Sequence, residues 1–502
     1  MIAAATLVAA GLRLFHLGAQ SLWIDEVLTW NSAHIGKAFG SSELLENVHG
    51  PLFSLIEHYW CGWASDSEWA LRLPSVLFGV ATVPAIAWLA GRWLGRPVAV
   101  WAAWLLALSP FHVWYSQEAR NYSLLMLCAC VSGALALDLR ERLTVRGAAL
   151  YVATAWAGLL SNLSFAFPFP LHLAWALGPR GQRMRRAALA GVVALVVLAA
   201  AIPWAPQATR IWDWQRLHPG RAVEHGEARL RGATTFHAAA VPFAAHAFAV
   251  GYTLGPSLRE LRADHSFATV RRHAPGIAVV TLVFAALGLL GLLSLRRRGR
   301  LGEALLWLLP PLAVVCWFAV ANFKVFHPRY LAVAFPMFVL VLAAAFADLR
   351  PRWRGVLAGA VLALWLRSLW VLYFDPHYGK EDYRSASALI ARGAVAGEKV
   401  LAVNTADELF YYYRGPLPIE SFWLGYAADP ERLELKLRQA MAGASGRWVV
   451  LSRSEDQDPT GSFVRRFEAT YPDAGRWQLE GIRVWHVAAP AAAAERAAPA
   501  RR

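Results

Sequence analysis

Two adjacent carboxylates, Asp25 and Glu26, follow the first hydrophobic segment of the chain, in the sequence SLWIDEVLT of residues 21–29. A charged side chain is costly inside lipid, so the pair is expected at the mouth of a membrane bundle, where it can face water and a substrate. A carboxylate in that position can act as a general base. The alternative is that both acids are solvated loop charges, or charges that a helix start favours.

A second polar group is the segment FHVWYSQEARNYS, residues 111–123. Glu118 is a further carboxylate, and Arg120 offers a planar cationic fork that suits a phosphate. Tyr115 and Tyr122 add hydroxyl donors. The simpler interpretation is that Glu118 and Arg120 pair with each other at a helix start.

A third polar group, KVFHPRY, precedes a hydrophobic run directly. Lys324, His327 and Arg329 are its potential cations, and Tyr330 adds a hydroxyl. Near a helix N-terminus such cations and the free backbone donors together favour an anion such as phosphate. Anchoring to lipid headgroups is the alternative.

His49, which stands before a Gly-Pro pair, is a further candidate site residue. A lone histidine is more often a packed or capping residue. The acids and histidines have no dedicated metal-ligand spacing, so the sequence predicts no certain cofactor and leaves a divalent cation open.

The elements that must position these groups are membrane helices. The chain has 502 residues, of which 57% are hydrophobic and 17% charged, and its mean hydropathy is +0.38. This composition excludes an ordinary soluble domain. The formal charge of +15 comes from short basic clusters between apolar runs. That is the pattern of cytoplasmic loops, and no nucleic-acid-binding motif accompanies it.

Eleven apolar runs are expected to be spans: 2–18, 74–91, 97–110, 121–138, 147–162, 166–178, 187–203, 277–295, 302–321, 331–347 and 355–373. Two further apolar stretches, 51–64 and 238–254, are expected to lie at the outer interface as juxtamembrane helices. The N-terminus is then cytoplasmic. The four cysteines, Cys61, Cys128, Cys130 and Cys316, are expected to be small core residues rather than metal ligands or a disulfide frame.

This topology brings four polar loops to the outer face, namely 20–73, 111–120, 204–275 and 322–330. Residues 1–373 would form the membrane domain. After it, residues 374–488 read as a small α/β domain outside the membrane, with helices at 381–392 and 430–442 and strands at 399–403 and 448–452. The Ala-, Pro- and Arg-rich residues 489–502 are expected to be a disordered tail.

The order of several motifs resembles bacterial family 39 glycosyltransferases of the GT-C class, together with protein O-mannosyltransferases and the lipid A aminoarabinose transferase. The motifs are WIDE, HGP, ALRLPS at 70–75, SPFHVWYSQEARNYS, FHPRYLAVAFP and KEDYRSASALI at 380–390. The resemblance runs over most of the chain and is strongest in the first 130 residues.

The resemblance implies a GT-C fold, a polyprenyl-phosphate sugar donor and an inverting transfer to a lipid, glycan or protein acceptor. Asp25 would be the catalytic acid position, with Glu26 beside it and Glu118 as the acid of the second outer loop. The donor-phosphate contacts would come from the second and third polar groups: Arg120, Tyr122, Lys324, His327, Arg329 and Tyr330. His49 and Tyr115 would contact the acceptor or the sugar. The HGP motif departs from relatives that have His or Lys before two prolines.

The implied location is the bacterial inner (cytoplasmic) membrane, with the active site and the C-terminal domain facing the periplasm. Two other functions are compatible with the sequence. One is a transporter or flippase of lipid-linked anionic glycans, which would place its ionisable residues near mid-membrane. The other is a noncatalytic envelope scaffold whose outer domain binds a partner.

Overall fold

The computed structural model describes residues 1–35, 50–176, 191, 194–199, 202, 239–264, 266–320, 326–403, 405–422, 430–442, 446–458 and 461–488.

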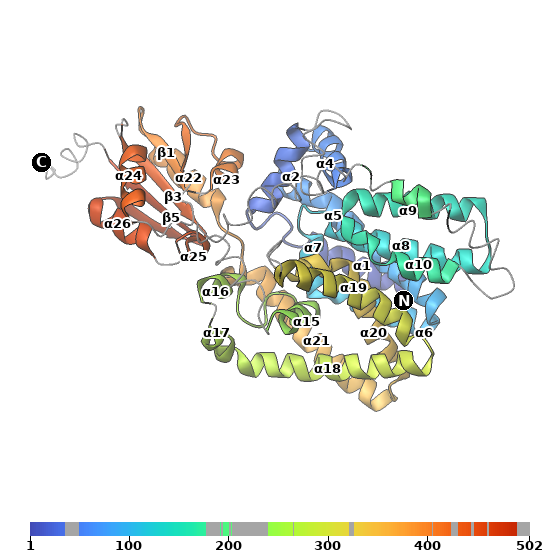
Figure 1. The fold of residues 1–502 in the computed structure, drawn as a ribbon. Helices are drawn as coiled ribbons and strands as arrows, with labels where there is room; N and C mark the ends of the chain where they lie inside the picture. Colours follow the sequence, from blue (N-terminus) through green and yellow to red (C-terminus); the bar gives the residue numbers. More distant parts are fainter. Residues whose placement is uncertain are drawn as a thin grey trace, which may run out of the picture.

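A bundle of helices and a C-terminal α/β domain lie side by side (Figure 1). The bundle begins with α1 (Ile2–Leu14), α2 (Ile24–Ile35), α4 (Pro51–Trp63), α5 (Glu68–Trp93), α6 (Arg96–Leu108), α7 (Pro110–Ser116), α8 (Tyr122–Glu141), α9 (Val145–Ser161), η1 (Leu163–Ala166) and α10 (Phe169–Ala176). It continues with α15 (Ala240–Val250), α16 (Leu258–Ala263), α17 (Phe267–Arg272), α18 (Ala274–Arg297), α19 (Leu301–Val320), η4 (Pro328–Ala334), α20 (Phe335–Asp348), α21 (Pro351–Phe374) and η5 (Pro376–Tyr378).

Six helical segments of the described chain are long and apolar enough to cross a membrane: α5, α8, α18, α19, η4 with α20, and α21. The pair α6 and α7 would add a seventh span. The chain is therefore a multi-pass membrane protein. Helices α1, α9 and α10 lie where spans were predicted but have only 13, 17 and 8 residues. Most of the predicted span 187–203 lies outside the described residues, so the total of eleven stays a prediction.

The predicted loop 111–120 was wrong in its first half, because residues 110–116 form α7. Ser109 ends α6 and caps α7, accepting a hydrogen bond from the backbone N–H of His112. Pro110 stands at the first position of α7, where its missing N–H costs nothing. The chain bends by 60° there. This bend directs the end of α7, and the residues that follow it, toward the site.

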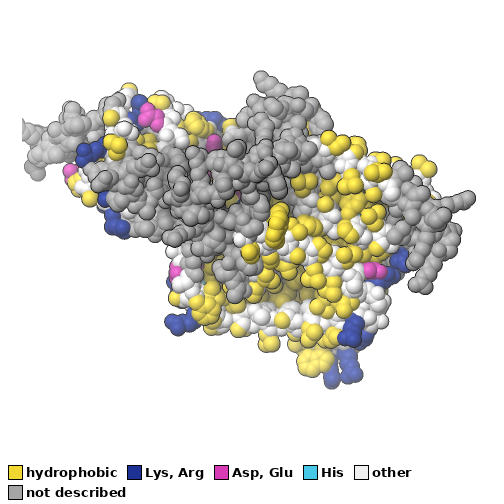
Figure 2. Space-filling model, viewed as in Figure 1, with side chains coloured by type: hydrophobic (Ala, Val, Ile, Leu, Met, Phe, Trp, Pro, Cys, Tyr) yellow, Lys and Arg dark blue, Asp and Glu magenta, His cyan; other side chains and the backbone are white. Residues whose placement is uncertain are grey.

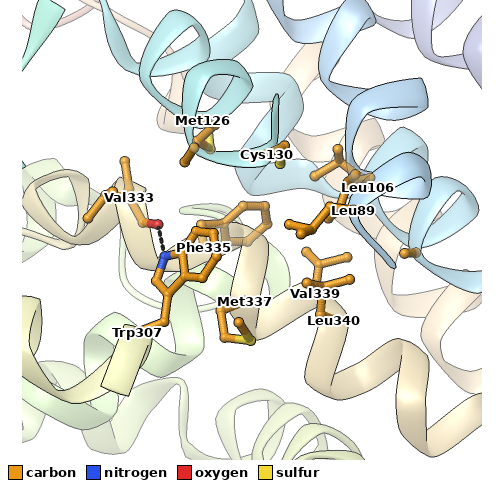
Figure 3. Packing of buried hydrophobic residues seen from close by; sticks show 14 of the residues in the cluster. Leu89, Leu106, Met126, Cys130, Trp307, Val333, Phe335, Met337, Val339 and Leu340 are labelled. Carbon is orange, nitrogen blue, oxygen red and sulfur yellow. Dashed lines mark hydrogen bonds between the residues drawn. The ribbon is translucent and has the colours of Figure 1, made fainter. Parts of the chain in front are cut away.

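The centre of the bundle is built on α20, which packs against α6, α8, α18 and α19 (Figure 3). Leu89, Leu106 and Met126 surround the start of α20, and the predicted core position of Cys128 and Cys130 is confirmed. The Trp307 indole N–H donates to the Val333 carbonyl at 2.9 Å. Because Val333 belongs to η4, this bond fixes the short helix on which Arg329 stands.

The two ends of the bundle differ in chemistry. At one end Arg92 pairs with Asp138 and Glu141, and Arg298 pairs with Asp348 at 2.6 Å. These pairs gather the ends of α5, α8, α18 and α20. The opposite end carries α2, the start of α5 and the C-terminal domain (Figure 1).

Helices α18 and α21 present hydrophobic side chains outward. Their exposed members include Leu282, Leu289, Leu366 and Trp370. Figure 2 shows hydrophobic side chains spread over the helical part and basic side chains gathered at its lower right margin. An apolar belt of this kind suits contact with lipid.

The C-terminal domain holds a five-stranded sheet in the order β2-β1-β3-β5-β4. Its elements are α22 (Tyr383–Gly393), β1 (Lys399–Val403), α23 (Ala406–Tyr412), β2 (Ile419–Phe422), α24 (Pro430–Met441), β3 (Arg447–Ser452), α25 (Ser454–Gln457), α26 (Ser462–Thr470), β4 (Gly475–Leu479) and β5 (Ile482–Val487). Strand β1 is parallel to β2 and β3, whereas β5 is antiparallel to β3 and β4. The predicted α/β character is confirmed.

Candidate active site

Asp25 lies in the first turn of α2 and pairs with Arg329 of η4, across 304 residues of sequence. The distance from Arg329 Nη1 to Asp25 Oδ2 is 2.6 Å, and the two side chains are 18% and 19% exposed. The Arg329 guanidinium also lies over the rings of Trp23 and Tyr330, at 5.4 and 5.3 Å from their centroids. The first and third polar groups of the sequence therefore meet at a partly open position.

Arg120 supports the helix that carries Asp25. Its Nη1 donates to the Asp25 backbone carbonyl at 2.9 Å and to the Thr29 hydroxyl at 3.0 Å. The residue is only 4% exposed. These contacts hold α2 in place, and the phosphate contact expected of Arg120 stays a prediction.

Glu26 is fully buried and surrounded by donors. Arg72 binds both carboxylate oxygens, at 2.8 and 2.9 Å, and Lys380 Nζ lies 2.9 Å from Oε2. The Ala119 backbone N–H donates to Oε1 at 3.0 Å. Burial opposes the charge, but Arg72 and Lys380 outweigh it and lower the pKa of Glu26 to about 2. Glu26 is thus held as a carboxylate by these donors, and its expected catalytic role stays a prediction.

Glu118 follows α7 and has an incomplete set of partners. Its Oε1 accepts a hydrogen bond of 2.7 Å from the Trp114 indole and lies 3.9 Å from Lys380 Nζ. Its Oε2 is buried and has no hydrogen-bond partner among the described residues. Burial raises the pKa of Glu118 to about 7, although Lys380 lowers it in part. Glu118 can therefore exchange a proton near neutral pH.

The expected tyrosines and His327 form an aromatic wall beside Arg329. The hydroxyls of Tyr115 and Tyr252 are 2.7 Å apart, and the Tyr122 ring lies edge-on to Tyr115 at 4.9 Å. His327 caps η4 by accepting from the Arg329 backbone N–H at 3.2 Å. The Tyr330 ring lies under the Arg329 guanidinium. The remaining two predicted residues, His49 and Lys324, lie outside the described residues.

Three residues of this site were missed by sequence reasoning: Arg72, Trp114 and Lys380. Arg72 lies near the start of the largely apolar helix α5, where a buried basic residue needs a partner. That signal was available. Nothing in the local sequence around Lys380 indicates that its amine reaches Glu26, because the two are 354 residues apart.

A cavity lies on the Glu118 side of the site. It is lined by His16, Leu17, Ala19, Gln20, Arg72, Trp114, Gln117, Glu118, Leu372, Tyr373 and Lys380. Its volume is about 410 Å³ when the space open to solvent is included. Within the described ranges no group of three His, Cys, Asp or Glu side chains could hold a metal ion.

Comparison with known proteins gives a family match over part of the chain and a fold for most of it. Residues 48–206 match the family described as dolichyl-phosphate-mannose-protein mannosyltransferase. No curated protein sequence matches the chain. Among solved structures, ArnT from Cupriavidus metallidurans in the apo state has a TM-score of 0.58 and 15% identity over 97% of both chains.

Two further structures have the same fold. ArnT bound to undecaprenyl phosphate gives a TM-score of 0.57 at 15% identity, again over 97% of both chains. The oligosaccharyltransferase AglB from Archaeoglobus fulgidus, in complex with an inhibitory peptide and a dolichol-phosphate, gives 0.53 at 13% identity over 96% of this chain and 73% of AglB. Residues 48–206 are thus similar to the protein mannosyltransferases, and the chain has the fold of ArnT and AglB.

Proposed function

We propose that this protein transfers a sugar from a polyprenyl-phosphate donor to a lipid, glycan or protein acceptor on the outer side of a bacterial inner membrane. The observation that carries the proposal is the pairing of Asp25 with Arg329 at 2.6 Å in a partly exposed position. The pairing puts a carboxylate base beside a cation that can receive a phosphate. The lipid phosphates bound by ArnT and AglB support this donor class.

The charges of the site favour an anionic ligand. Arg72, Arg120, Arg329 and Lys380 supply four cations, whereas Asp25, Glu26 and Glu118 supply at most three negative charges. A bound phosphate would restore the balance. Arg329 is the most exposed of these cations, at 18% of its side chain, and is therefore the best candidate for the phosphate contact.

The proposed reaction is a single displacement. The acceptor oxygen attacks the anomeric carbon of the sugar from the face opposite the phosphate, and the anomeric configuration inverts. The bond from carbon to the phosphate oxygen breaks, and polyprenyl phosphate leaves with the electron pair. Asp25 takes the proton of the acceptor, while Arg329 neutralises the leaving group.

The position of the acids argues against a transporter or flippase. Transporters usually hold their ionisable groups near mid-membrane on broken helices. Here Asp25 begins α2 and Glu118 follows α7, both at the end of the bundle that meets the C-terminal domain. Such a position suits a reaction at the membrane surface.

The test is an Asp25→Asn variant of the full chain, assayed with a labelled polyprenyl-phosphate sugar and an envelope fraction as acceptor. Because general-base catalysis typically contributes about 10²- to 10⁴-fold, we expect kcat to fall at least about 100-fold. The donor KM should not rise, since the proposed phosphate contact with Arg329 remains and its competing carboxylate is gone. Asp66→Asn is the control, because Asp66 is an exposed acid that pairs with His34.

Full turnover by Asp25→Asn would remove Asp25 from the mechanism. Movement of a lipid-linked sugar across vesicles, with no transfer to any acceptor, would favour the flippase instead.

A further inference from the structure

Lys380 brings a cation into the site from the far end of the chain. It lies beyond η5, between the last membrane helix and the C-terminal sheet. Its Nζ is 2.9 Å from Glu26 Oε2 and 3.9 Å from Glu118 Oε1, and its side chain is 10% exposed. Its backbone N–H donates to Gln20 Oε1 at 3.2 Å. One amine thus bridges an acid of α2 and the acid that follows α7.

The segment that carries Lys380 is held at both sides. On the domain side, the Asp382 backbone N–H donates to the Glu480 carbonyl at 2.9 Å. On the membrane side, Arg384 pairs with Glu68 at 2.6 Å and donates to the Gly18 carbonyl at 3.0 Å. The amine is therefore placed by the docked domain rather than by a free linker.

Glu118 and Lys380 line the same cavity. The cavity is lined by polar as well as apolar side chains and is large enough to admit water. Glu118 Oε2 is buried without a hydrogen-bond partner in the described part of the chain. A buried carboxylate oxygen normally has a donor, so the cavity beside it is the place for a water or an acceptor hydroxyl.

We propose that Lys380 is a positioning residue of the transferase, which keeps Glu118 ionised and oriented toward this cavity, so that its free oxygen accepts a hydrogen bond from the acceptor or its water. This inference rests on the proposed function. It adds that the C-terminal domain completes the active site, and that the protonation of Glu118 sets the acid side of the activity profile.

Several charged groups act on Glu118 besides Lys380. Asp25 and Glu26 of α2 favour its protonated form, and Arg329 of η4 favours its ionised form. Arg72, His16 and Tyr373 line the cavity from α5 and from the ends of α1 and α21. Among these groups Lys380 has the largest effect on Glu118, so its removal should change the pH profile most.

The experiment compares Lys380→Met and Lys380→Arg in the full chain across pH 5 to 9. For Lys380→Met we expect kcat near neutral pH to fall about 10- to 100-fold. The acid limb of the activity–pH profile should move to higher pH by about one unit, because Glu118 loses the positive charge of Lys380 at 3.9 Å. Lys380→Arg should restore the limb in part. Lys399→Met is the control, because Lys399 pairs with Glu420 in the sheet.

A second comparison separates positioning from folding. In a Glu118→Gln background, Lys380→Met should cost far less activity than in the wild-type chain, because the group on which Lys380 acts is gone. Equal losses in both backgrounds, or a loss with an unchanged acid limb, would overturn the proposal. If Lys380→Met does not give folded protein, Lys380→Gln carries the same test. A wild-type chain without transferase activity would overturn the proposed function and this inference with it, whereas an active wild-type chain with equal losses in both backgrounds would overturn the role of Lys380 alone.

Discussion

Three acids with the same chemistry have three environments in this site. Asp25 is partly exposed and shares one cation, Arg329. Glu26 is buried among Arg72, Lys380 and a backbone N–H, and is held as a carboxylate. Glu118 is buried with one oxygen unpartnered among the described residues. The neighbours of each acid, rather than its residue type, therefore indicate which one can exchange protons.

The raised pKa of Glu118 predicts a measurable effect on stability. Its ordinary value is 4.5 and burial raises it to about 7, so the folded state binds the proton more tightly than the unfolded state. The contribution of this group to stability therefore declines as the pH rises from about 4.5 to 7. Glu118→Gln removes the ionisable group. Over this pH range the free energy of unfolding should therefore fall less for the variant than for the wild-type chain, with a difference of up to about 3 kcal/mol.

The measurement is thermal unfolding in detergent at pH 5 and pH 8, followed by tryptophan fluorescence. We expect the fall in Tm between the two pH values to be smaller for Glu118→Gln than for the wild-type chain. Parallel curves would show that Glu118 is not protonated in the folded protein. The same variant should lose transferase activity, which separates stability from function.

At the residue scale, Asp25, Glu118 and Arg329 could be proposed from the sequence as candidates. Each is a charged residue beside an apolar run, where a charge costs free energy unless it has a function or a partner. It could not distinguish Glu26 from Asp25. Adjacent residues of a helix point in different directions, and which one meets Arg72 depends on contacts made 46 residues later. The contacts of Arg120 with Asp25 and Thr29 could not be predicted either, because they join residues more than 90 positions apart.

At the scale of elements, the packing of α18 on α20 depends on one glycine. A Cβ at Gly291 would lie 2.1 Å from the Val341 carbonyl oxygen, which is backbone and cannot move aside. On the same helix, a Cβ at Gly288 would meet nothing within 4 Å. Gly291 therefore has no room for a side chain, whereas Gly288 has. Helix α20 follows directly from η4 and so anchors the element that carries Arg329.

We therefore expect Gly291→Ala to destabilise the protein by about 1–3 kcal/mol, because the added methyl group overfills a packed contact. Gly288→Ala should be neutral or stabilising by up to about 1 kcal/mol, because alanine is the better helix former. Thermal unfolding of both variants is the measurement. A similar Tm change for the two would contradict the close approach of α18 and α20.

Apolar runs predicted the positions of the long helices well, because length and hydropathy decide which segments can cross a membrane. The bend between α6 and α7 and the 3₁₀ segment η4 were not predicted. The bend has a local cause, because Ser109 is a helix-capping residue and Pro110 is suited to the first helical position. This Ser-Pro pair is a recognisable signal for the start of a new helix. The segment η4 depends on the Trp307 bond to Val333, which no local pattern reveals.

At the scale of the whole molecule, the basic clusters and the site lie at opposite ends of the bundle. Arg92 and Arg298 are at one end, and Asp25 and the C-terminal domain at the other. Basic loops favour the cytoplasmic side, so this polarity predicts an outward-facing site. The parity of the predicted spans agrees with the same orientation.

Cysteine labelling in intact cells tests this orientation. In a chain whose four native cysteines are replaced by alanine, we expect Thr470→Cys in the C-terminal domain to react with a membrane-impermeant maleimide. Arg142→Cys, at the exposed basic end of α8, should react only after the membrane is opened. The reverse pattern would place the site in the cytoplasm.

The contact between Asp25 and Arg329 ties the proposed base to the proposed phosphate contact. The carboxylate already accepts from the guanidinium at 2.6 Å. Under the proposed mechanism, a lipid phosphate that engages Arg329 would draw the guanidinium away and free Asp25 to accept a proton. The donor would thereby switch on its own base, and an acceptor that arrived before the donor would meet no free carboxylate.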